Sequence, residues 1–146
     1  MCWIEIKDNI NIQIADKDFK VYKIVFDANK QSCTSLVKGF NYTVNTLYAI
    51  PTIESKVIGP YCEKIKIEKA YHSYTEIHFI CGASYYNDGA TRCRDLLFGN
   101  RAVCIPFENE VYIATFIIPK GSTYIINTKG EVVSDKIIYT GRYLKL

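Results

Sequence analysis

The sequence predicts an α+β fold in which most of the chain forms a predominantly antiparallel β-sheet and one segment, about residues 88–98, forms a helix. The last third of the chain predicts the sheet most clearly, because runs of Val, Ile, Tyr and Phe are separated by two turn sequences, at 119–122 and 127–130. Aromatic residues make up 14% of the chain, with 12 Tyr, and aromatic and β-branched residues favour strands.

The first half of the chain also shows strands separated by turns. Alternating Ile residues predict one or two strands over 3–14, and the sequence FKVYKIVFD predicts a stronger strand over 19–27. Gly39 and Asn45 mark turns around two short strands within 36–50. The remaining expectations are a turn at 15–18, a polar loop at 28–35, a surface loop at 51–64, a strand at 65–80 and a short strand at 102–105.

The helix is predicted from the spacing of apolar residues in the segment that follows. Four of them fall on one helical face: Ala90, Cys93, Leu96 and Leu97. Asp88 is a suitable N-cap, and Gly99 can end the helix in a left-handed conformation. We therefore expect a single clear helix next to a sheet.

Composition bounds the class of protein. The length of 146 residues indicates one domain, 1–146, and 49% hydrophobic with 23% charged residues argues against disorder. The net charge of +3, from 18 basic and 15 acidic residues, is small for a protein that binds nucleic acid, so we do not expect extended nucleic acid as a partner. The oligomeric state is left open.

Six Cys residues and the N-terminal sequence indicate the compartment. MCWIEIKDNINIQI carries charges within its apolar run, which is not typical of a signal peptide, and no apolar run approaches the ~18 residues of a membrane span. We expect reduced cysteines, a cytoplasmic protein and no membrane contact. His72, His78 and Cys81 lack the close C-x-x-C spacing of a zinc site, so we expect no metal and no cofactor.

The densest cluster of reactive residue types is Tyr71-His72-Ser73-Tyr74. On a strand, His72 and Tyr74 would lie on one face, with Tyr71 and Ser73 on the other. A His and a Tyr together can bind a nucleobase or a phosphate by stacking and hydrogen bonding. The alternative is a His and Tyr whose polar groups are satisfied within the sheet.

Three stretches together resemble a group of small uncharacterised proteins of gut bacteria and their phages. They are FKVYKIV, IEKAYHSY followed by the expected helix, and TFIIPKGSTYIINTKGEVVSDKIIY. The group shares a V-Y-K strand, a G-x-H-S-[FY] strand that leads into a helix, and an I-P-K-G-[ST]-x-Y hairpin ending in [AS]-[SD]-K. The match covers about half of the chain, and the group has no established activity.

The same order of segments is similar, more faintly, to ADP-ribosyltransferase folds. In that family a first strand, a central S-T-S strand and a late Glu shape a cleft for NAD. Here Tyr22-Lys23 stands where Arg or His is expected, His72-Ser73-Tyr74 replaces S-T-S, and only Glu131 represents the late E-x-E. For an enzyme, the resemblance implies a site with His72, Ser73 and Glu131.

We therefore carry three hypotheses. The first is a phage or mobile-element accessory protein, in the host cytoplasm, that captures a small nucleotide-derived ligand such as a host immune signal. Its expected ligand contacts are Tyr22, Lys23, His72, Tyr74, Arg92 and Lys120. The second is an interaction module for a host or virion protein, and the third a degenerate ADP-ribosyltransferase-like or nucleotide-cleaving enzyme. The lack of a complete catalytic set favours binding over catalysis.

Overall fold

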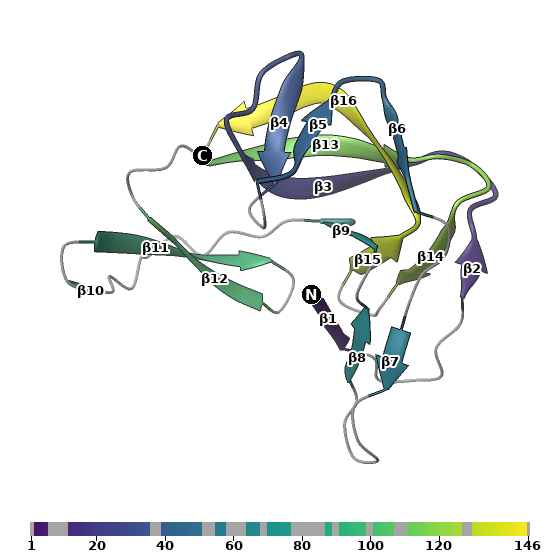
Figure 1. Ribbon diagram of the computed structural model, residues 1–146, viewed down its shortest axis with the longest axis horizontal. Helices are drawn as coiled ribbons and strands as arrows, with labels where there is room; N and C mark the ends of the chain where they lie inside the picture. The colour runs from purple at the N-terminus through teal and green to yellow at the C-terminus, as the bar shows by residue number, and fades with distance from the viewer. Residues whose placement is uncertain are drawn as a thin grey trace.

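In the residues that it describes, the computed structural model consists of β-strands and turns (Figure 1). It describes residues 2–5, 12–35, 39–50, 55–57, 64–67, 70–76, 87–88, 91–98, 101–106, 111–126 and 130–145. The strands are β1 (Cys2–Glu5), β2 (Gln13–Ile14), β3 (Phe19–Phe26), β4 (Ser32–Ser35), β5 (Asn41–Thr43), β6 (Leu47–Ala49), β7 (Ser55–Val57), β8 (Lys64–Ile67), β9 (Tyr71–Tyr74), β10 (Asn87–Asp88), β11 (Thr91–Phe98), β12 (Arg101–Pro106), β13 (Val111–Ile118), β14 (Thr123–Ile126), β15 (Glu131–Ser134) and β16 (Lys136–Lys145).

Ten of these strands form the main sheet. Eight follow the order β2-β14-β15-β9-β3-β13-β16-β6, and β4 and β5 add to it through β3. All paired strands in it are antiparallel, and the longest ladder joins β13 to β3 over eight residue pairs, from Val111↔Phe26 to Ile118↔Phe19. This agrees with the antiparallel sheet that the alternating sequence predicts.

Five strands of the main sheet close into a ring, which lies at the top of Figure 1. β13 pairs with β3 and β16, β4 pairs with β3 and β5, and a bridge between Val44 and Tyr139 joins the end of β5 to β16. The Asn45 amide also donates to the Tyr139 carbonyl over 2.9 Å. The ring therefore encloses the core between β3, β13 and β16 on one side and β4 and β5 on the other.

Aromatic side chains fill this core. Phe116 and Tyr139 are fully buried, and the Phe116 ring lies 5.1 Å from that of Tyr42 and 5.2 Å from that of Tyr139. Such ring pairs contribute about 0.5–1.5 kcal/mol each beyond their buried area. Aliphatic residues complete the cluster, mainly Val21, Val25, Ala114, Ile118, Val132 and Ile137.

Gly141 allows the ring to close. Its φ is +81°, and a Cβ there would lie 2.9 Å from the Lys30 carbonyl oxygen and 3.0 Å from a methyl carbon of Val44. Beside this approach, the buried Tyr139 hydroxyl donates to the Asn29 carbonyl over 2.7 Å. Only glycine fits both the left-handed conformation and the close contact.

The prediction of a helix at 88–98, and with it the α+β fold class, is wrong. The described residues contain no helix, and their fold class is all-β. β10 and β11 occupy that segment, and β11 pairs with β12 over six residues, from Cys93↔Pro106 to Phe98↔Arg101. Gly99 and Asn100, which separate the two strands in the sequence, lie outside the described part of the chain, and so does the helix end expected at Gly99. Pairing with the β-branched residues of β12 outweighs the helical spacing of the apolar residues.

Other local expectations had mixed outcomes. The two short strands around Gly39 and Asn45 are confirmed, and both turn residues have positive φ, 60° and 55°. The polar loop at 28–35 was wrong in its second half, which forms β4. Part of the surface loop at 51–64 is β7, in a small sheet of order β1-β8-β7. The expected strand at 65–80 is divided into β8 and β9, and its residues 77–80 lie outside the described part of the chain.

Candidate functional site

Four of the residues singled out in the sequence share the face of the main sheet opposite the core. Tyr22 on β3 is paired with Tyr74 on β9, and Tyr74 is paired with Glu131 on β15. Paired residues point to the same face of a sheet, and so does His72, two residues from Tyr74. Glu131 is 4% exposed, whereas the other three are half-buried. The alternation expected in Tyr71–Tyr74 is therefore present.

Lys23 and Ser73 point the other way, toward the core. The Lys23 ammonium donates to the His72 carbonyl and lies 5.7 Å from the centre of the Tyr42 ring. β3 and β9 share the pair Tyr22↔Tyr74, and the bond from Lys23 to His72 joins the same two strands beside this pair. Lys23 is thus a structural contact that joins the two strands, on a different face from Tyr22 and Tyr74.

The three residues expected of an enzyme do not converge. Ser73 is paired with Val132, a member of the core cluster, and its side chain is 1% exposed. Among the residues that the structure describes, its hydroxyl has no hydrogen-bond partner. His72 and Glu131 lie on the opposite face, so the Ser73 hydroxyl cannot act together with them on one substrate.

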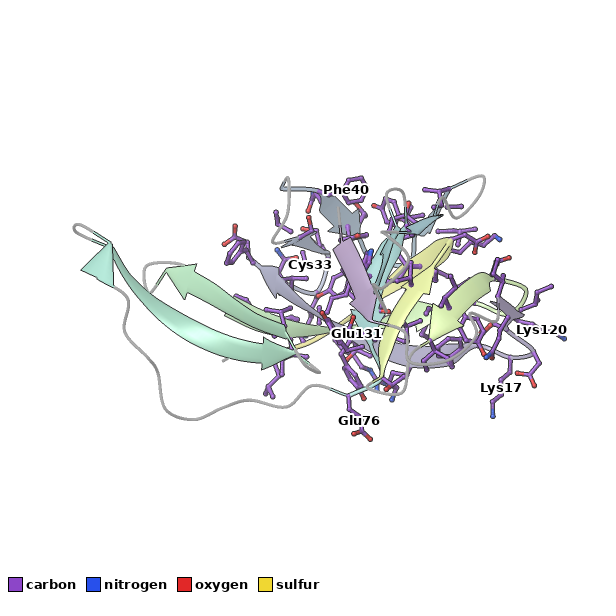
Figure 2. All side chains as sticks on the ribbon, turned by 90° about the horizontal axis from the view of Figure 1, so that it is seen from below. Lys17, Cys33, Phe40, Glu76, Lys120 and Glu131 are labelled. Carbon is purple, nitrogen blue, oxygen red and sulfur yellow. The ribbon has the colours of Figure 1, made fainter. Side chains whose placement is uncertain are left out.

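The turn that carries Lys120 is closed by its own hydrogen bonds. The Lys120 amide donates to the Asp18 carboxylate over 2.7 Å, and the Gly121 amide donates to the Ala15 carbonyl over 2.8 Å. The Ser122 amide donates to the Pro119 carbonyl over 3.1 Å. These amides are therefore not available to cradle a phosphate. Figure 2 shows Lys120 at one end of the main sheet, away from Glu131 at its centre.

Arg92 lies on β11, in the sheet of order β10-β11-β12, and its side chain is outside the described part of the structure. It belongs to a different sheet from Tyr22 and Tyr74. The structure therefore brings together Tyr22, His72 and Tyr74 from the expected ligand contacts, and separates Lys23 and Lys120 from them.

A bulge in β16 adds a feature that the sequence analysis did not predict. Between the pairs Phe116↔Tyr139 and Ala114↔Tyr143, β16 has two residues more than β13. The Thr140 hydroxyl fixes this bulge, since it donates to the Thr115 carbonyl over 2.7 Å and accepts from the Arg142 amide over 3.3 Å. The bulge directs Arg142 to the same face as Tyr22.

Beside the bulge lies a hollow of about 280 Å³, which we call the β16 hollow. It is lined by Tyr22, Ile113, Thr115, Arg142, Tyr143 and Leu144. Two aromatic rings line the hollow. Tyr22 lies on the side of β3, and Tyr143, on β16, also makes an edge contact with Tyr112, with 5.6 Å between the ring centres. The hollow combines aromatic rings, a hydroxyl, a guanidinium and aliphatic side chains.

The charge of Arg142 is not neutralised by any neighbour that the structure describes. Arg142 is exposed, and among the described residues its guanidinium makes no ion pair. An unpaired guanidinium at a hollow suits an anionic group such as a phosphate or carboxylate, which it can bind with two parallel hydrogen bonds.

The titratable groups of the core are not suited to chemistry. Burial raises the pKa of the Cys33 thiol to about 12, although the nearby Lys23 ammonium lowers it in part. Burial, followed by interaction with Cys33 and Tyr143, raises the pKa of Tyr139. Cys33 is therefore an inert buried thiol at neutral pH. The described residues hold no cluster of His, Cys, Asp and Glu that could bind a metal ion.

Sequence reasoning missed Thr115, Arg142 and the hollow. A signal existed in Thr140-Gly141-Arg142, because a glycine inside a strand pattern often marks a bulge or a close backbone approach. The placement of Arg142 beside Tyr22 had no local signal, because it depends on the pairing of β3, β13 and β16.

No family model matches the chain, and neither the curated proteins nor the solved structures contain a match. The resemblances to phage proteins and to ADP-ribosyltransferases thus stay expectations. None of the described residues forms a helix that could cross a membrane.

Proposed function

We propose that the protein is a binding protein that captures a small nucleotide-derived ligand in the β16 hollow. The observation that carries this proposal is the Arg142 guanidinium, which forms no ion pair with any described residue and lines the same hollow as the Tyr22 ring. Arg is well suited to bind phosphate, and an aromatic ring can stack on a nucleobase of any kind. The aliphatic side chains of Ile113 and Leu144 add an apolar wall.

The size of the hollow favours a small ligand. Ligand pockets usually have volumes of roughly 300–1,000 Å³, and the β16 hollow, at about 280 Å³, is slightly smaller than the lower limit of this range. A single nucleoside unit suits it better than a dinucleotide. Ser73 faces away from His72 and Glu131, which favours capture over turnover.

The biological setting of the proposal comes from the resemblance to small phage proteins. In that setting the protein would act in the cytoplasm of the host cell and sequester a nucleotide signal of the host's defence. The residues Tyr22, Arg142 and Thr115 would contact the ligand, and Tyr74 and His72 would support Tyr22 from the neighbouring strand.

Thermal unfolding with a panel of nucleotides tests the proposal. A ligand at 100 times its Kd stabilises the folded state by about 2.7 kcal/mol, which raises the Tm of a domain of this size by roughly 5–11 °C. We expect such a shift with at least one mono- or dinucleotide, cyclic nucleotide or NAD derivative, and calorimetry then gives its Kd.

Three variants and one control assign the site. Arg142→Gln should weaken binding tenfold or more, and Tyr22→Leu should weaken it while Tyr22→Phe preserves it, because Phe keeps the stacking ring. Lys17→Gln changes an exposed cation in the turn that precedes β3, five residues before Tyr22 and outside the lining of the hollow, and should leave the Kd unchanged. Equal binding by the wild type and Arg142→Gln would refute the placement of the ligand.

A protein partner is the second candidate, favoured by the apolar edge of the main sheet. Ile12 and Ile14, at β2, are 64% and 72% exposed, and β2 is the first strand in the order of the sheet. An edge strand with exposed apolar residues can accept a strand from another protein. If no nucleotide shifts the Tm, we expect a host or virion protein to co-purify with the wild type. The double variant Ile12→Lys/Ile14→Lys should abolish this co-purification.

A further inference from the structure

A second exposed cation lies on the same face as the β16 hollow. Lys20 is on β3, two residues from Tyr22, and is paired with Ile117 of β13. Because alternate residues of a strand point to the same side, Lys20 and Tyr22 share a face. Lys20 is exposed, and within the described residues its ammonium makes no ion pair.

The residues of this face follow a linear order along β13. Ile113 is paired with Leu144 and Ile24 at the apolar end. Thr115, paired with Tyr22 and next to the bulge that carries Arg142, lies in the middle. Ile117 is paired with Lys20 at the other end. With a rise of about 3.3 Å per residue, Ile113 and Ile117 are roughly 13 Å apart.

We propose that the ligand carries two consecutive phosphate groups, as a nucleoside diphosphate does. This inference rests on the proposed function. The nucleoside would occupy the β16 hollow, Arg142 would bind one phosphate, and Lys20 would bind the other. Lys20 lies about 7 Å from Tyr22 along β3, so a second phosphate that extends from the hollow along β3 would approach its flexible side chain.

The charges agree with the proposed assignment. A diphosphate carries more negative charge than one guanidinium neutralises, and the exposed Lys20 and Arg142 together supply two positive charges on one face of the sheet. The two cations also differ in role. The guanidinium has a planar geometry for bidentate binding, while the lysine ammonium acts as a flexible point charge at the end of the ligand.

The experiment compares ADP with AMP, and GDP with GMP, in calorimetry with wild type, Lys20→Gln, Arg142→Gln and the control Lys17→Gln. We expect the wild type to bind the diphosphate of at least one pair tenfold or more tightly than the monophosphate. Lys20→Gln should reduce this preference to less than threefold and leave the monophosphate Kd unchanged. Arg142→Gln should weaken both ligands, and Lys17→Gln should resemble the wild type.

Three outcomes would contradict the inference, and they are distinguishable. Equal affinity of the wild type for mono- and diphosphates would refute a diphosphate ligand but leave nucleotide binding intact. A preference that persists in Lys20→Gln would refute the role of Lys20. Binding of none of the four nucleotides, with no Tm shift in the wider panel, would overturn the proposed function together with the inference. Since Lys20 is exposed, its variant should keep the wild-type Tm, which serves as the folding control.

Discussion

Replacement of Gly141 by Ala should destabilise the protein strongly, because two separate costs meet at this position. The first is the left-handed conformation, φ +81°, which costs an L-residue about 1–2 kcal/mol. The second is the approach of the new Cβ to the Lys30 carbonyl oxygen, 2.9 Å, and to a Val44 methyl carbon, 3.0 Å. Relief of the clash requires a backbone shift where β16 closes the ring, and overpacking of this kind costs about 1–3 kcal/mol.

Gly121 offers a matched control. Its φ is +87°, close to that of Gly141, but no atom lies within 4 Å of the position that a Cβ would take. Gly121→Ala should therefore carry the conformational cost alone. The difference in unfolding free energy between the two variants, about 1–3 kcal/mol, measures the clash. Gly130→Ala should fall between them, since its Cβ would meet the Thr75 hydroxyl oxygen, 2.5 Å away on a side chain that can rotate.

Urea denaturation, followed by circular dichroism, gives the three free energies under one set of conditions. The expected order of stability is wild type, Gly121→Ala, Gly130→Ala, Gly141→Ala. If Gly141→Ala cost no more than Gly121→Ala, within about 0.5 kcal/mol, the contact between β16 and the turn at Lys30 would not exist in solution. The closure of the five-stranded ring would then rest on the Val44–Tyr139 bridge and the hydrogen bond from Asn45 to Tyr139.

Three further predictions concern polar and titratable groups of the core. Ser73→Ala should leave stability unchanged or raise it, because it removes a buried hydroxyl that has no partner among the described residues. Ser134→Ala should cost about 1 kcal/mol, because it loses the bond to the Lys136 carbonyl. Equal losses of stability in urea denaturation would contradict this contrast. Tyr139→Phe should also cost about 1 kcal/mol, since the bond to the Asn29 carbonyl is lost, and an unchanged urea midpoint would refute it. Stability should fall as the pH rises above 9, because the pKa of Cys33, ordinarily 9.0, is about 12 in the folded state and the pKa of Tyr139 is also raised. The unfolded chain loses these protons first, so each group lowers the unfolding free energy by about 1.4 kcal/mol per pH unit between its unfolded and folded pKa. Cys33→Ala should therefore make the decline measurably shallower between pH 9 and 11.

Local sequence determined much of the main sheet. Apolar and polar residues alternate in Phe19–Phe26, and this pattern predicts a strand with one apolar face. The turn at Pro119–Ser122 requires a glycine with positive φ, and Gly121 has a φ of +87°. The same alternation separated His72 and Tyr74 from Tyr71 and Ser73, which the pairing of β9 with β15 bears out. These features depend on neighbours in the chain, so the chain alone predicts them.

Only the tertiary structure decided the fate of residues 88–98 and the place of the candidate site. The apolar spacing around Cys93 suits a helix, yet pairing with β12 makes this segment a strand. Tyr22 and Arg142 come from opposite ends of the sequence and meet because β13 pairs with both β3 and β16. Lys23, next to Tyr22, points instead into the core. Long-range pairing sets the register of a sheet, and the register determines which side chains share a face, so no local pattern could have assembled the β16 hollow.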